Sequence, residues 1–144
     1  IAQARLHAEQ HGVTANTRFE VALASEFPGS NLDLVTFFDC LHDMGDPVGA
    51  ARHVRQVLKA DGTWMIVEPA AGDRLEDNLN PVSRLYFAAS TMICVPVSLA
   101  RQGPALGAQA GEHRLAEVMV AQGGFSRFGR VAETPFNLVF EARP

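Results

Sequence analysis

The pattern of apolar and polar positions divides the first part of the chain into one helix and two strands. Ala2–Gln10 is rich in good helix formers, and His11-Gly12 marks its end. Phe19–Leu23 alternates between apolar and polar residues, as a half-buried strand does. After turn residues at Phe27–Asn31, Leu32–Phe38 is an almost continuous run of β-formers. Such a run is typical of a parallel strand that is covered on both faces.

The next stretch predicts a helix and another buried strand. Asp46-Pro47 matches a helix N-cap followed by proline at the first helical position. Apolar residues then recur at helical spacing until Lys59, and Asp61-Gly62 is a helix end. Thr63–Val67 is a second apolar strand, stopped by Glu68-Pro69. Together with Leu32–Phe38, these elements form a right-handed parallel crossover.

The remainder of the chain predicts two helices and a hairpin. In order, these are a helix over Pro81–Val95 ended by Pro96, a Gly- and Ala-rich loop over Arg101–Glu112, an amphipathic helix over His113–Gln122, and strands over Phe125–Val131 and Phe136–Ala142. The two strands are separated by only four residues, so we expect them to be antiparallel. The alternation as a whole predicts an α/β fold: a mostly parallel sheet with helices on both faces and a C-terminal antiparallel hairpin.

Composition narrows the possible partners. The 144 residues suggest one domain, and 47% hydrophobic with 19% charged residues is ordinary for a globular protein. The net charge of −4 and the lack of a basic cluster disfavour nucleic acid. The most apolar segment, Leu85–Leu99, is interrupted by polar residues and proline, so we expect a buried helix and no membrane partner. With no signal peptide and two cysteines in apolar surroundings, we expect a cytoplasmic protein with reduced thiols.

Titratable side chains gather directly after the strand Leu32–Phe38. Asp39, His42, Asp43 and Asp46 offer oxygen and nitrogen ligands for a hard divalent cation. No paired histidine or cysteine motif accompanies them, and Asp46 has a capping role, so we expect no metal. Cys40 is a poor candidate nucleophile, because neighbouring acids raise the pKa of a thiol.

Three segments carry a resemblance to a known family: "DLVTFFDCLHDMGDP" (Asp33–Pro47), "HVRQVLKADGTWMIVEP" (His53–Pro69) and the closing "GGFSRFGRV…PFNLVFEARP". In this order and spacing they resemble the C-terminal part of a class I S-adenosylmethionine-dependent methyltransferase domain. "LHDMGDP" is similar to a region of the small-molecule O-methyltransferases. The resemblance implies a Rossmann-like fold, S-adenosylmethionine as cofactor, and a small-molecule methyl acceptor with O-methylation favoured.

The family's Gly-rich cofactor turn has no counterpart in the sequence. Gly103–Gly111 repeats glycine but follows no strand. We therefore expect that the first two strands of the full fold are missing, that methyl transfer requires further N-terminal residues, and that the fragment alone is inactive. A non-catalytic binding or regulatory module on the same fold is the alternative.

The resemblance also implies roles for particular residues. Ala24 and Ser25 would lie beside the adenine, and Phe27 would either pack on the adenine ring or close the core. Phe38 and Asp39 would contact the cofactor, Asp39 at its amino-acid portion. His42 stands where these enzymes carry a catalytic base, with Asp43 or Asp39 to orient it and Glu68 in reach from the neighbouring strand end. Alternatively, His42 and Asp43 stabilise the loop before the helix.

Residues 70–112 stand where the family places a variable loop and helix insertion. The apolar and aromatic side chains of its helix suit either a hydrophobic methyl acceptor or a dimer interface. Because missing strands would leave apolar surface open, we also expect self-association, as a homodimer.

Overall fold

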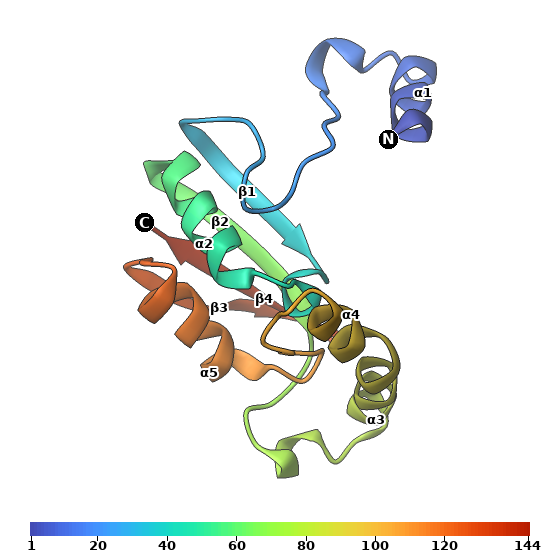
Figure 1. Cartoon of the computed structure of the whole chain (residues 1–144), viewed down its shortest axis with the longest axis vertical. Helices are drawn as coiled ribbons and strands as arrows, with labels where there is room; N and C mark the ends of the chain where they lie inside the picture. The colour runs from blue at the N-terminus through green and yellow to red at the C-terminus, as the bar shows by residue number, and fades with distance from the viewer.

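Four strands form a single sheet in the order β1-β2-β4-β3 in the computed structural model, which describes residues 1–144 (Figure 1). β1 (Leu32–Phe38) pairs in parallel with β2 (Leu58–Pro69). β4 (Asn137–Arg143) runs antiparallel to both β2 and β3 (Arg127–Glu133). The predicted α/β fold with a C-terminal antiparallel hairpin is confirmed. Of the three pairings only β1–β2 is parallel, where the sequence predicted a mostly parallel sheet.

The crossover between β1 and β2 contains α2 (Pro47–Val57), which begins as predicted. The carboxylate of Asp46 accepts a hydrogen bond from the Gly49 amide at 2.7 Å, and so caps the helix. The predicted helix end at Asp61-Gly62 is wrong, because Leu58 already has extended backbone angles and begins β2. Gly62 allows close strand pairing there, since a Cβ at this position would lie 2.8 Å from the Leu32 carbonyl.

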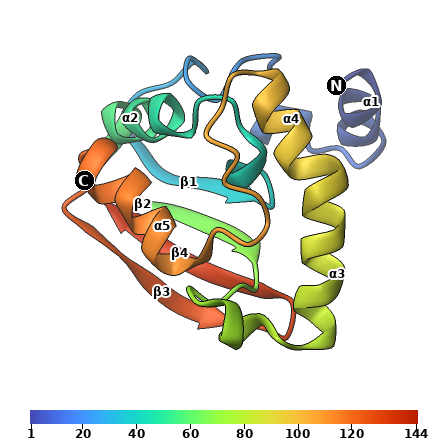
Figure 2. The ribbon, with the colours of Figure 1, turned by 60° about the horizontal axis from the view of Figure 1, so that its bottom comes forward.

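The hydrophobic core lies between one face of the sheet and the helices that cover it. Trp64 and Ile66 of β2 and Phe140 of β4 are fully buried on this face. α2 and the helical segment formed by α5 (Gly111–Ala116) and the π-helical turn η5 (Glu117–Gln122) lie over it (Figures 1 and 2). Trp64 packs edge-to-face against Phe37 of β1, with 4.9 Å between ring centroids.

The opposite face of the sheet is largely uncovered, whereas we expected helices on both faces. Leu34 and Phe38 of β1 point to this face and are 55% and 59% exposed. Val35, on the covered face, is only 8% exposed. β1 is therefore a strand buried on one face only, and it is an edge strand.

The N-terminal segment lies away from the sheet (Figure 1). α1 (Ala2–Gln10) has the predicted bounds, and the 3₁₀ turn η1 (Thr14–Asn16) follows it. The strand predicted over Phe19–Leu23 is wrong: this segment is irregular, and Val21 and Leu23 are 86% and 64% exposed. An alternating segment forms a stable strand only against neighbouring strands, and this one pairs with none.

A long helical segment crosses the carboxyl ends of the parallel strands (Figure 2). It consists of α3 (Pro81–Ala89), the π-helical turn η4 (Ser90–Cys94) and α4 (Val95–Ala100), after the 3₁₀ turn η3 (Leu75–Asn78). The predicted end at Val95 is wrong. Pro96 lies in the first turn of α4, directly after the π turn, where a missing amide hydrogen is tolerated.

This segment buries its serines and exposes its large apolar residues. Ser83, Ser90 and Ser98 are at most 3% exposed. Leu85, Met92, Ile93 and Leu99 are 57–71% exposed, so the expectation of a buried helix is wrong. By length and composition alone, Pro81–Ala100 is a helix that could cross a membrane. A single helix of this kind is weak evidence for such a span.

The loop after α4 packs closely on the loop between β1 and α2. The Ser98 hydroxyl donates a hydrogen bond to the Met44 carbonyl at 2.9 Å. A Cβ at Gly45 would lie 2.7 Å from the Arg101 carbonyl oxygen, and a Cβ at Gly103 would lie 2.7 Å from the Met44 carbonyl oxygen. Only glycine permits this backbone approach.

Gly103→Ala should therefore destabilise the protein by about 1–3 kcal/mol, because backbone atoms must move to admit the methyl group. Gly129→Ala is the matched control, since a Cβ there has no neighbour within 4 Å and alanine is preferred to glycine in a strand. Urea unfolding of both variants measures the difference. Equal stability of Gly103→Ala and wild type would show that this approach does not constrain the fold.

Candidate functional site

The carboxyl ends of β1 and β2 lie side by side. Phe38 is paired with Val67, so Asp39 and Glu68 are the next residues along the two strands. The Asp39 amide donates to the Val67 carbonyl at 2.8 Å. Asp39 has a φ of +45°, in the left-handed region that few non-glycine residues adopt. Its carboxylate accepts a hydrogen bond from the Asn137 side chain at 3.0 Å.

Glu68 connects the end of β2 to the 3₁₀ turn η2 (Leu41–Asp43). One carboxylate oxygen accepts a hydrogen bond from the Leu41 amide at 3.0 Å, and the other is hydrogen-bonded to Nδ1 of His42. Both side chains are buried, at 2% and 4% exposure. In the tautomer that donates this hydrogen bond, Nδ1 carries the proton and Nε2 keeps its lone pair.

Asp43 lies on the other side of the imidazole ring. Its Oδ1 is 3.1 Å from Nε2 of His42. This oxygen is buried and has no hydrogen-bond partner. The structure therefore brings together His42, Asp43 and Glu68, the three residues expected to carry catalysis.

The charges around His42 set its protonation. Burial disfavours the imidazolium, but the hydrogen bond to Glu68 and the negative charges of Glu68, Asp43 and Asp39 outweigh it, so the pKa of His42 is raised above 6.5. Burial, together with the charge of Glu68, raises the pKa of Cys40 to about 11. Cys40 is thus a neutral thiol at physiological pH, in line with the expectation that it is no nucleophile.

The residues expected near the cofactor lie in two places. Ala24 and Ser25 line an open hollow of about 400 Å³ whose other walls include Gly45, Asp46 and Arg101. Phe38 and Asp39 lie at the tip of β1.

Phe27 makes contacts that belong to the core. Its ring packs edge-to-face on His53 of α2, with 4.5 Å between centroids. Nε2 of His53 is 2.8 Å from the Phe27 carbonyl oxygen, within hydrogen-bond distance. These contacts correspond to the core-closing alternative.

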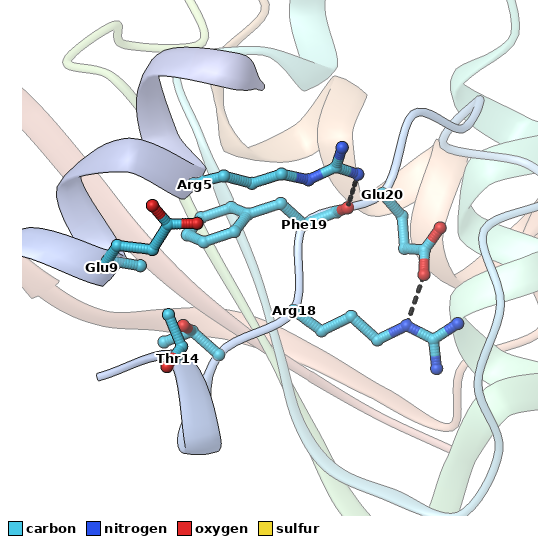
Figure 3. Close-up of a pocket in the computed structure, with 8 residues that line it drawn as sticks. Arg5, Glu9, Thr14, Arg18, Phe19 and Glu20 are labelled. Atoms are coloured by element: carbon cyan, nitrogen blue, oxygen red, sulfur yellow. Dashed lines mark hydrogen bonds and ion pairs between the residues drawn. The ribbon is translucent and has the colours of Figure 1, made fainter. Parts of the chain in front are cut away.

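A second hollow, of about 330 Å³, lies between α1 and residues 14–20 (Figure 3). Arg5 donates a hydrogen bond to the Phe19 carbonyl at 2.8 Å, and Arg18 pairs with Glu20. Arg18 is largely exposed, and exposed ion pairs contribute little to stability. None of the expected site residues lines this hollow.

The sequence did not predict three contributors to the site, which are Ser90, Ser98 and Cys94. The Ser90 hydroxyl accepts from the Ala108 amide at 3.0 Å, and the Ser98 hydroxyl accepts from the Ala105 amide at 3.1 Å. These bonds hold the loop after α4, whose Gly107 amide donates to the His42 carbonyl at 3.2 Å. The spacing of Ser83, Ser90 and Ser98 at seven and eight residues was the available signal. Cys94, which lies beside Asp43 and His42, had no such signal.

The family described as "Methyltransferase domain" matches residues 1–133. No curated protein matches the sequence. Among solved structures, a putative O-methyltransferase from Nostoc punctiforme superposes with a TM-score of 0.71 at 18% identity, over 98% of this chain and 41% of that one.

Two further structures share the fold. Mitomycin 7-O-methyltransferase gives a TM-score of 0.67 at 17% identity, over 99% of this chain and 39% of that one. Human N-acetylserotonin methyltransferase, in complex with S-adenosylmethionine, gives 0.60 at 17% identity, over 91% and 36%. The chain spans less than half the length of each of these proteins.

The His42–Glu68 pair should contribute a pH-dependent part of the stability. Because the pKa of His42 is raised in the folded state, this contribution is fully present below pH 6.5 and is lost as the pH rises through the folded pKa. His42→Ala should cost about 3–5 kcal/mol near pH 6, since it leaves Glu68 buried without its partner. Urea unfolding between about pH 5.5 and 8.5, the range in which histidine titrates, measures this contribution.

The matched control is His113→Gln, an exposed histidine whose replacement should leave the unfolding free energy close to wild type. A His42→Ala cost that does not change with pH would contradict the assigned charge interaction.

Proposed function

Because this chain belongs to the methyltransferase domain family, we propose that it takes part in S-adenosylmethionine-dependent methyl transfer to a small-molecule acceptor, with oxygen as the favoured acceptor atom. The shared fold with O-methyltransferases supports the reaction class. The observation that carries the proposal is the buried hydrogen bond between Glu68 and Nδ1 of His42.

The reaction needs a base and an orienting group. S-adenosylmethionine, when bound, supplies an electrophilic methyl group on a sulfonium. Transfer of that methyl group to an acceptor oxygen would require the acceptor hydroxyl to lose its proton. Nε2 of His42 is the nitrogen that takes this proton, because Nδ1 is already engaged by Glu68. Glu68 orients the ring, and Asp43 adds negative charge beside Nε2.

The residues present fit one part of a site for an adenosyl group. The hollow of about 400 Å³ beside Ala24 and Ser25 is large enough for a nucleoside-sized ligand. We assign these two residues to the adenine, with Phe27 supporting their turn from the core. Asp39 at the strand tip is available for the positively charged amino group of the cofactor, and the exposed ring of Phe38 lies next to it in the chain.

We propose that residues 70–112 bind the methyl acceptor. A hollow of about 280 Å³ on this region is lined by Leu75, Leu79 and Phe87 together with polar neighbours. Leu75 and Leu79 are 66% and 77% exposed, and Met92 extends the apolar surface along the helix. A hydrophobic acceptor suits such a wall, and so does a second copy of the chain, which is the homodimer we expect.

The direct test is the His42→Gln variant of the full-length protein. If Nε2 accepts the acceptor proton, kcat should fall by about 10²–10⁴-fold. The wild-type rate should rise with pH and level off above the raised pKa of His42, because only the neutral imidazole is a base. His113→Gln should retain wild-type activity. An unchanged kcat in His42→Gln would show that methyl transfer proceeds by proximity alone.

A second candidate, a non-catalytic binding or regulatory module, is favoured by one observation. Gly103–Gly111, the Gly-repeating stretch, follows α4 rather than a strand, so it does not provide a phosphate- or adenosyl-binding turn. We therefore propose that the 144 residues alone bind S-adenosylmethionine weakly or not at all and are inactive. Titration calorimetry of the purified chain measures this, and micromolar affinity would contradict it.

A further inference from the structure

A histidine, an aspartate and a cysteine from two distant parts of the chain meet beside the proposed base. His42 and Asp43 lie on η2, and Cys94 lies at the end of the π turn η4. One ligand atom of each residue, an imidazole nitrogen, a carboxylate oxygen and Sγ, lies within 4.8 Å of the other two. A π turn inside a helix is frequent at functional sites, because it changes the direction of one side chain.

Two independent observations indicate that this cluster is built for a ligand. Oδ1 of Asp43 is buried and lies 3.1 Å from Nε2 of His42 without forming a well-aligned hydrogen bond, so the two atoms lie side by side as two ligands of one ion would. In addition, the hydrogen bond of Glu68 to Nδ1 of His42 leaves Nε2, which faces Asp43, as the ring nitrogen available to bind a ligand. Metal-binding histidines commonly donate the N–H of their other ring nitrogen to a carboxylate, as Nδ1 of His42 does to Glu68.

We propose that His42, Asp43 and Cys94 form a binding site for a thiophilic divalent cation of the zinc class. The hard-cation site considered from the sequence used only carboxylates and His42. The thiol of Cys94 changes the preference, because sulfur ligands select zinc over magnesium, calcium or manganese. Three protein ligands leave the fourth tetrahedral position open to water. On binding, the Cys94 thiol releases its proton to solvent and a metal–sulfur bond forms.

The site has a consequence for methyl transfer, and this part rests on the proposed function. A cation on Nε2 occupies the nitrogen that would take the acceptor proton. Zinc and the methyl acceptor are therefore mutually exclusive, and the cation is a reversible inhibitor. The binding itself does not depend on catalysis, so it is measured separately.

The experiment is a cobalt titration of the reduced, chelator-treated chain, followed by electronic absorption. Cobalt replaces zinc in such sites, and its bond to a thiolate gives a charge-transfer band. We expect this band to saturate at one cobalt per chain and to disappear when zinc is added. Cys94→Ser should abolish it, whereas Cys40→Ser, which removes the other free cysteine, should retain it.

A second variant keeps the test independent of folding defects. Asp43→Asn retains the shape of a partly exposed side chain and should weaken cobalt binding by about tenfold or more. Circular dichroism establishes that each variant is folded. The proposal is overturned if no thiolate band forms, if the band persists in Cys94→Ser, or if it disappears in Cys40→Ser. None of these outcomes bears on methyl transfer, which His42→Gln tests.

Discussion

The buried carboxylate of Glu68 determines the geometry of the whole site. It accepts one hydrogen bond from the Leu41 amide and is hydrogen-bonded through its other oxygen to His42, so it fixes both the path of the loop after β1 and the orientation of the imidazole. A carboxylate with 2% exposure is tolerated because both of its oxygens have partners. Without this carboxylate, the η2 turn would lose its hydrogen bond to β2, and the imidazole ring of His42 would have no fixed orientation.

The fold could be predicted where local signals and tertiary packing agree. Leu32–Phe38 is an apolar run of β-formers that also contacts the core through Val35, and Asp46-Pro47 starts α2 through a side-chain cap. Prediction failed where the conformation of a segment depends on the segments that pack beside it. Phe19–Leu23 alternates correctly but has no strand beside it, and Leu58 leaves the helix early because pairing with Leu32 favours the extended backbone.

The site could be predicted as far as it depends on strand order. Adjacent parallel strands end at the same edge, so Glu68 had to lie near the residues that follow Phe38. Cys94 could not be placed in this way. Its position depends on a π turn and on the packing of serines against the loop after β1, and neither leaves a periodic signal around the cysteine itself. The resemblance implied the reaction class, and the hydrogen bonds of the structure support the roles that we propose for the residues.

Position 39 imposes two requirements, and few amino acids meet both. Its backbone is left-handed, and its side-chain oxygen accepts a hydrogen bond from Asn137. Glycine satisfies the first requirement, and only aspartate and asparagine readily satisfy both. The local electrostatic potential at the strand tip is therefore adjustable by exchanging one oxygen for an amide nitrogen, with the chain path preserved. For protein engineering, this makes position 39 a place to alter ligand charge preference independently of scaffold geometry.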